Sequence, residues 1–154
     1  MVLRVPDAAA MRALGRELAA QASAGDLYVL TGTLGAGKTT LVQGLAEGLG
    51  VRERVTSPTF VLMRSYHTDR GIDLVHVDAY RLWTGEELDD LDIDVAASIT
   101  AVEWGAQAAP RLADRWVAID ITADDEIVDL RHVVIREDTA HAFIAAGPTG
   151  DEQA

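Results

Sequence analysis

The sequence of 154 residues contains no cysteine and no asparagine, and Lys38 is the only lysine among its 13 basic residues. The absence of cysteine excludes disulfides and thiolate-bound metal sites. No apolar run approaches the roughly 18 residues that a membrane-spanning helix requires. Residues 1–16 have neither the apolar core of a signal peptide nor the pattern of a transit peptide. These absences predict a soluble, cytoplasmic protein.

Basic residues are also scarce beside acidic ones, and the formal net charge is −12. A surface this acidic repels the phosphate backbone of nucleic acids, so tight and independent binding of DNA or RNA is not expected. A role in nucleic-acid metabolism through a basic partner stays open. So does the simpler interpretation that the charge only keeps the protein soluble.

The length is that of one compact domain, which we place at residues 1–146, followed by a flexible tail at residues 147–154 that is rich in Gly, Pro and charge. Strands are expected at residues 2–5 and 27–31. A helix with the N-cap Asp7 lies between them, and a second helix follows Lys38 and stops at Gly50.

The second half of the chain is rich in strand-like runs, at residues 60–66, 72–77, 99–103, 116–121 and 130–135, with a turn expected at residues 69–71. Thr84 and Glu87 have the spacing of a capping box, which predicts a short helix before Leu91. Strands separated by helices predict an α/β fold. We therefore expect a three-layer domain like that of P-loop NTPases, with a mixed, mainly parallel sheet.

Residues 32–39, with the sequence GTLGAGKT, fit the phosphate-loop pattern G-x-x-x-x-G-K-[ST] in full. They follow a predicted buried strand and precede a predicted amphipathic helix, as the mechanism requires. The glycines let backbone N–H groups surround an anion, and the helix N-terminus attracts it further. Lys38 would reach the β- and γ-phosphates, and the Thr39 hydroxyl would bind Mg²⁺. The alternative is a glycine-rich turn that binds nothing.

The missing asparagine also bears on the base of the nucleotide. Loop GTPases read guanine with an N-K-x-D element, which needs an asparagine and, in this chain, a second lysine. Neither is present. ATP is therefore favoured over GTP.

Two acidic residues follow predicted strands, Asp78 after residues 74–77 and Glu103 after residues 99–102. In open α/β sheets, ligands gather at the carboxyl ends of the strands, so both acids are candidates for holding Mg²⁺ or aligning the attacking water. Taken alone, either one is equally well explained as a solvated carboxylate at a strand end, but the phosphate loop favours a role at the site. The acidic runs at residues 89–94 and 124–126 are interpreted as solvated surface.

A further segment, residues 56–60 (TSPTF), lies where loop NTPases carry a mobile element that meets the γ-phosphate. It is equally well explained as the start of a strand. The four histidines have no metal-ligand spacing, so no transition-metal site is expected.

Taken together, five elements occur in a familiar order: GTLGAGKTT at residues 32–40, SPTF at 57–60, HVDAYR at 76–81, EEL at 86–88 and EW at 103–104. This series closely resembles the bacterial TsaE family over about residues 3–135. The resemblance implies a small ATPase of tRNA threonylcarbamoyladenosine biosynthesis. Such an ATPase acts with the TsaD and TsaB subunits on tRNAs that read ANN codons, and contacts tRNA through that complex.

The resemblance also assigns residues. The nucleotide loop maps onto Gly35, Ala36, Gly37, Lys38, Thr39 and Thr40, the Mg²⁺ ligands onto Thr39 and Glu103, and the strand-end aspartate onto Asp78. Lys38, Asp78 and Glu103 are thus the catalytic candidates, and Trp104 is the aromatic residue beside the site, although core packing explains it equally well. Two positions depart from the family pattern: Thr33 stands where many relatives have Asp or Glu, and Asp92 where many have Gly.

Two other functions compete with this one. A small-molecule or nucleotide kinase on the same scaffold would carry an arginine-rich lid, whereas the arginines here are dispersed. A nucleotide-binding module that does not hydrolyse would not need two strand-end acids. We therefore expect an ATP hydrolase that is weak in isolation.

Overall fold

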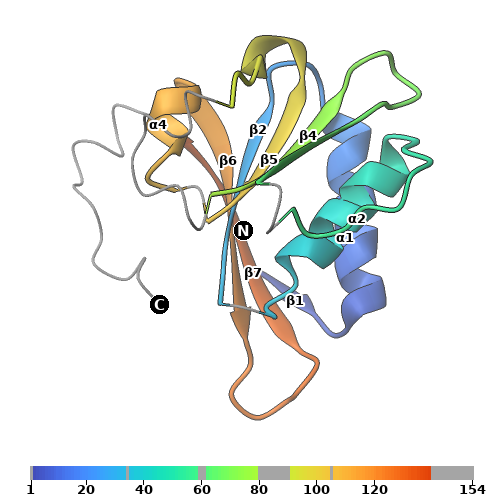
Figure 1. The fold of residues 1–154 in the computed structure, drawn as a ribbon. Helices are drawn as coiled ribbons and strands as arrows, with labels where there is room; N and C mark the ends of the chain where they lie inside the picture. The colour runs from blue at the N-terminus through green and yellow to red at the C-terminus, as the bar shows by residue number, and fades with distance from the viewer. Residues whose placement is uncertain (1, 34, 59–61, 80–90, 105, 140–154) are drawn as a thin grey trace.

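A computed structural model describes residues 2–33, 35–58, 62–79, 91–104 and 106–139. Its elements, in chain order, are β1 (Val2–Val5), α1 (Ala8–Gln21), β2 (Leu27–Thr31), α2 (Lys38–Gly48), β3 (Met63–Tyr66), β4 (Leu74–Asp78), the 3-10 helix η1 (Val95–Ala97), β5 (Ile99–Glu103), α4 (Ala109–Leu112), β6 (Arg115–Ala123) and β7 (Arg131–Thr139). They form an α/β domain around one sheet (Figure 1).

The sheet has seven strands in the order β1-β7-β6-β2-β5-β4-β3. The four neighbours β6, β2, β5 and β4 are parallel to one another. β3 pairs antiparallel with β4, and β7 pairs antiparallel with both β6 and β1, so only β3 and β7 oppose the other five strands. The sheet is therefore mixed and mainly parallel, as expected from the sequence.

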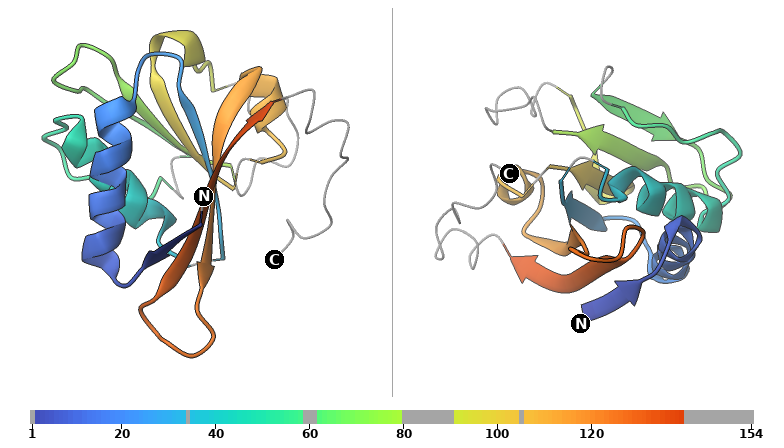
Figure 2. Two further views of the ribbon diagram at one scale, coloured as in Figure 1. Left: turned by 180° about the vertical axis from the view of Figure 1, so that it is seen from behind. Right: turned by 90° about the horizontal axis from the view of Figure 1, so that it is seen from below.

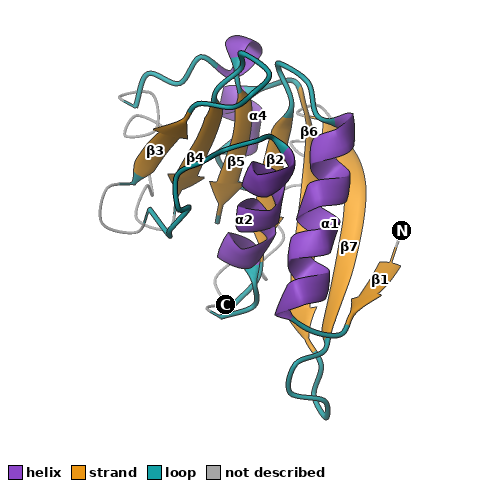
Figure 3. Cartoon of the chain, turned by 90° about the vertical axis from the view of Figure 1, so that its right-hand side faces the viewer, coloured by secondary structure: helices purple, strands orange, loops and turns teal. Residues whose placement is uncertain are grey.

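Helices α1 and α2 lie side by side on one face of the sheet, and the short α4 lies on the other (Figures 2 and 3). Each face has its own apolar cluster because side chains alternate along a strand. Tyr28 and Leu30 of β2 pack under α1 and α2, whereas Leu27 and Val29 pack on the α4 side. The predicted buried strand thus supplies both cores.

The two long helices begin where the sequence places them. Asp7 caps α1 by accepting a hydrogen bond from the Ala10 amide at 2.8 Å. α1 and α2 approach each other so closely that a Cβ at Gly15 would lie 2.3 Å from the Leu41 carbonyl oxygen, and one at Gly44 would lie 2.1 Å from that of Arg12. Side chains larger than glycine would push the two helices apart.

The turn predicted at residues 69–71 joins β3 and β4, with Gly71 at a φ of +74° and Tyr66 opposite Leu74. The strand predicted at residues 72–77 begins only at Leu74, and the strand predicted at 60–66 is seen from Met63, since residues 59–61 lie outside the described ranges. The same holds for the helix predicted after Thr84, for residues 89 and 90 of the acidic run at 89–94 and for the tail at 147–154. Asp92 and Asp94 of that run are described and exposed, as predicted.

The last two strands are longer than expected because they pair with each other from Arg115 opposite Thr139 to Ala123 opposite Arg131. Their polar outer residues carry no hydrophobic pattern that would reveal this length. The resulting hairpin extends past the sheet at the end where β2 leads into α2, at the bottom of Figures 1 and 3. In the ranges that the structure describes, no helix has the length and apolar character needed to cross a membrane.

Candidate functional site

The predicted phosphate loop lies between the carboxyl end of β2 and the N-terminus of α2. Gly35 and Gly37 have φ values of +80° and +112°, in a region of backbone conformation that favours glycine. Gly37 is also the N-cap of α2, with no side-chain hydrogen bond to the cap. The first amides of α2 are therefore directed at the loop, where a bound anion would satisfy them.

Lys38 is only 5% exposed. Its Nζ donates hydrogen bonds to the carbonyl oxygens of Gly32 at 2.5 Å and Thr33 at 3.0 Å, and lies 4.1 Å from the centre of the Trp104 ring. Burial lowers the pKa of this ammonium group, while the charges of Glu103 and Asp78 oppose that change. A buried ammonium bonded to neutral carbonyls is a fitting partner for a phosphate group.

Glu103, at the end of β5, connects helix α2 to the sheet. Each of its carboxylate oxygens lies 3.2 Å from Thr39 Oγ1 of α2. Its Oε2 also accepts from His76 Nε2 of β4 at 2.5 Å, and this pair is buried. Because a carboxylate only accepts hydrogen bonds, Nε2 of His76 carries the hydrogen.

Asp78 and Glu103 stand opposite each other in the parallel pairing of β4 and β5. Both are buried, at 6% and 4% exposure, so the interpretation of solvated strand-end carboxylates is wrong for both. The predicted acids therefore meet at one edge of the sheet, beside the loop. Thr40, the third residue of α2, is partly buried there.

In the described ranges, no group of three or more His, Asp or Glu side chains could hold a metal by itself. Thr39 and Glu103 nevertheless supply adjacent hydroxyl and carboxylate oxygens, which are the ligands that Mg²⁺ prefers. Mg²⁺ usually keeps waters and phosphate oxygens in the rest of its shell. The residues present fit such an ion when a nucleotide provides the remaining oxygens.

Trp104 is held at a φ of +62°, which is rare for a bulky residue and costs about 1–3 kcal/mol. The Trp104 ring lies over the Lys38 ammonium rather than in the core, so core packing does not explain this residue. Asp92 also has a positive φ, of +51°, a backbone conformation that glycine adopts freely and that aspartate tolerates.

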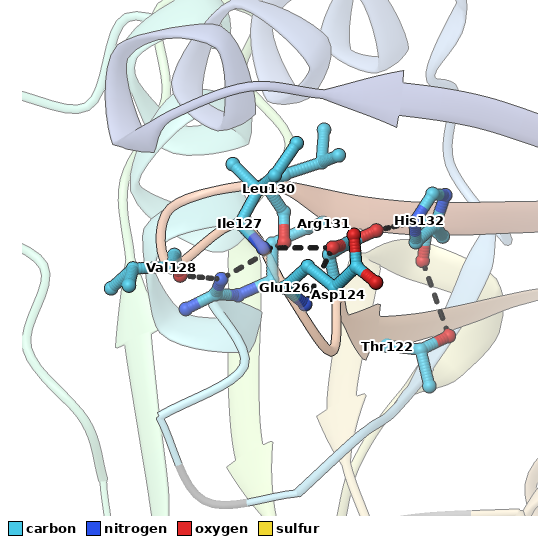
Figure 4. A network of polar contacts seen from close by, with 8 residues as sticks. All are labelled: Thr122, Asp124, Glu126, Ile127, Val128, Leu130, Arg131 and His132. Carbon is cyan, nitrogen blue, oxygen red and sulfur yellow. Dashed lines mark hydrogen bonds and ion pairs between the residues drawn. The ribbon is translucent and has the colours of Figure 1, made fainter.

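Some predicted features are only partly described. Residues 59–61 of the segment 56–60 lie outside the described ranges, so its role as a switch stays a prediction. The acidic run at 124–126 is not simply solvated surface. Asp124 accepts hydrogen bonds from the amides of Glu126 and Ile127, both at 2.9 Å, and from His132 Nε2 at 2.8 Å (Figure 4).

Sequence reasoning missed two residues at the site. His76 was not selected, although it lies two residues before Asp78 and therefore on the same face of β4. Arg131 of β7 was not selected either, yet its Nε donates to the Ala36 carbonyl oxygen in the loop at 3.1 Å. No pattern near Arg131 indicates a partner 95 positions away in the chain.

Comparisons with known proteins identify the family of this chain. The family model described as "Threonylcarbamoyl adenosine biosynthesis protein TsaE" matches residues 5–133. The tRNA threonylcarbamoyladenosine biosynthesis protein TsaE of Streptomyces coelicolor is 49% identical over 148 residues, covering 89% of this chain and 100% of that protein. The TsaE of Mycobacterium bovis is 45% identical over 112 residues, covering 66% of this chain and 67% of that protein.

The same fold occurs in a solved structure. The crystal structure of YdiB from Bacillus subtilis superposes with a TM-score of 0.72 at 28% sequence identity, covering 94% of this chain and 89% of that one. Since the family model spans residues 5–133 and a relative 49% identical is matched along its whole length, the chain belongs to the TsaE family.

Proposed function

We propose that this protein is a Mg²⁺-dependent ATPase of tRNA threonylcarbamoyladenosine biosynthesis, acting in the cytoplasm. The pathway is the one named for its family and relatives. The ATPase activity rests mainly on one observation, namely that a buried Lys38 and a Thr39–Glu103 pair lie at the same end of the sheet. This arrangement suits a nucleotide polyphosphate with its metal ion.

Each residue of the site has a separate role in this proposal. Lys38 balances the charge of the β- and γ-phosphates, and the amides of residues 35–40 donate to phosphate oxygens. Thr39 and Glu103 hold Mg²⁺, which when bound neutralises charge on the transferred phosphoryl group. Asp78, buried beside Glu103, is the candidate for orienting the attacking water. Trp104 covers the Lys38 ammonium and restricts its movement.

The nucleotide is ATP rather than GTP, because the chain has no asparagine with which to build a guanine-reading element. Hydrolysis by the isolated chain is slow. No arginine finger lies at an identifiable position in the sequence, and a finger supplied in trans is worth about 10³–10⁵ in rate. Family resemblance points to TsaD and TsaB as the subunits that raise the rate and hold the tRNA, which the net charge of −12 would otherwise repel.

The test replaces Lys38 by Ala and by Arg. Both variants should fold, bind ATP at least tenfold more weakly and lose hydrolysis, because neither side chain places a compact ammonium among the phosphates. Arg115→Ala is the matched control, since this arginine forms an exposed ion pair with Glu137 at the end of β6 that lies away from the phosphate loop. Unchanged turnover in a folded Lys38→Ala protein contradicts the assignment.

A second measurement addresses the pathway. Purified TsaD, TsaB and tRNA are combined with this chain, and repeated rounds of modification are counted for wild type, Asp78→Ala and Glu103→Ala. The two variants should stall after few rounds. If both sustain modification as well as wild type, hydrolysis by this subunit is not what the pathway needs.

A further inference from the structure

Arg131 connects the β6–β7 hairpin to the phosphate loop. It is the first residue of β7, and its Nε donates to the carbonyl oxygen of Ala36, 3.1 Å away. This contact joins the last strand of the chain to a loop 95 positions earlier in the sequence. Because the Ala36 carbonyl and the Gly37 N–H belong to one peptide group, this hydrogen bond also affects the direction of the Gly37 N–H.

The guanidinium of Arg131 is itself held in place by its own hairpin. Its NH1 group donates to the carbonyl oxygens of Val128 at 2.7 Å and Leu130 at 3.1 Å (Figure 4). The turn that carries these carbonyls is closed by Asp124, which accepts from two backbone amides and from His132. Arg131 is therefore a fixed donor rather than a freely moving side chain.

The bonded carbonyl decides the direction of the neighbouring amide. In a planar trans peptide, the C=O of one residue and the N–H of the next point in opposite directions. Fixing the Ala36 carbonyl on Arg131 therefore turns the Gly37 N–H away from the hairpin. Gly37, with a φ of +112° and no side chain, would otherwise permit this peptide to rotate and present its carbonyl to an anion.

We propose that Arg131 is a positioning residue of the nucleotide site, which acts through the Ala36–Gly37 peptide to keep the Gly37 N–H directed at bound phosphate. This inference rests on the proposed function, because it takes phosphate as the ligand of the loop. It assigns Arg131 no contact with the nucleotide. Its effect falls on the polyphosphate alone, whatever base is attached.

The experiment measures binding of ADP and of inorganic pyrophosphate by calorimetry without Mg²⁺, for wild type, Arg131→Gln, Arg131→Lys and Arg136→Gln. Arg136 lies on the same strand and pairs with Asp120, so its variant loses the same charge without touching the loop. Arg131→Gln and Arg131→Lys should each weaken both ligands by the same factor of about ten, the effect of one lost hydrogen bond. Arg136→Gln should bind as wild type does.

The outcomes separate the alternatives. Full affinity in Arg131→Gln overturns the inference, because the contact of Arg131 with the Ala36 carbonyl would then not be needed for phosphate binding. A loss for ADP but not for pyrophosphate also overturns it, since Arg131 would then contact the nucleoside. Failure of the wild-type protein to bind either ligand contradicts the proposed function instead. Melting temperatures of all four proteins identify a variant that has not folded, and Arg131→Lys, with its long cationic side chain, is the milder substitution.

Discussion

Two histidine–carboxylate pairs occur at the same end of the molecule in opposite surroundings. His76 and Glu103 are buried between strand and helix, with side chains 0% and 5% exposed, and lie 2.5 Å apart. His132 and Asp124 close the β6–β7 hairpin, with side chains 37% and 22% exposed, and lie 2.8 Å apart. A histidine–carboxylate pair therefore lies in a candidate catalytic site in one place and in a turn in the other.

The two carboxylates differ in what else they contact. Asp124 accepts from His132 and from two backbone amides, and these hydrogen bonds lower its pKa to about 2. Glu103 accepts from His76 and from Thr39, a hydroxyl that is also suited to bind metal. The hydrogen bonds of Asp124 all lie within the hairpin, whereas those of Glu103 connect β4, β5 and the first turn of α2.

The buried pair is also less well satisfied. Within the described residues, Nδ1 of His76 is buried and has no hydrogen-bond partner, which costs about 1–3 kcal/mol. Packed apolar side chains in place of both His76 and Glu103 would avoid this cost. We interpret the pair as retained for the orientation it imposes on Glu103. The buried pair therefore contributes more to the orientation of Glu103 than to the stability of the fold.

The largest effect is expected from His76, and the test uses Leu and Gln. His76→Leu removes the donor to buried Glu103 and should lower the free energy of unfolding by about 3 kcal/mol. His76→Gln keeps an N–H donor of similar reach and should lose less than half of that. Denaturant unfolding measures both. Equal losses in the two variants would show that packing matters here and the hydrogen bond does not.

The dependence of activity on Mg²⁺ also distinguishes Glu103 from Asp124. Thr39→Ala and Glu103→Ala should each raise the Mg²⁺ concentration needed for half-maximal activity by about tenfold, as expected if both donate oxygens to one hard cation. The matched substitution in the hairpin, Asp124→Asn, should leave that concentration unchanged. A wild-type Mg²⁺ dependence in Glu103→Ala would make Glu103 a structural residue.

A smaller, pH-dependent effect is expected at Asp124. Its pKa in the folded protein, about 2, lies below the ordinary value of 3.8, so its stabilising effect is complete above pH 4 and is lost as the pH falls towards 2. Wild type should therefore melt at a higher temperature than Asp124→Asn at pH 6, and the gap should close towards pH 2. Exposed Asp125 in the same hairpin supplies the control, Asp125→Asn. A gap that does not change with pH would contradict the assignment to Asp124.

The smallest effect is expected from a third pair, His67 and Asp73, which lie 2.9 Å apart with side chains 91% and 47% exposed. Exposed ion pairs contribute little because water screens them. His67→Ala should shift the melting temperature by no more than about 1 °C. A shift comparable to that of His76→Leu would show that burial is not what separates these pairs.

Several features of this protein follow from the sequence alone. The pattern of residues 32–39 predicts the loop, its flanking strand and helix, and the absence of asparagine favours ATP. Asp78 and Glu103 were recognisable because each follows a β-like run, and parallel strands bring their carboxyl ends together. These features depend on local spacing, which a sequence displays directly.

Only the tertiary structure decided which side chains hold these groups in place. His76 and Glu103 are 27 positions apart in the chain, Thr39 and Glu103 are 64, and Arg131 and Ala36 are 95. Such contacts depend on the order of strands in the sheet and on the hairpin that extends past it. A hydrogen bond between distant segments leaves no periodic trace in either one, so no local pattern indicated Arg131 as part of the site. The position of His76 two residues before Asp78 was visible in the sequence, but its hydrogen bond to Glu103 was not.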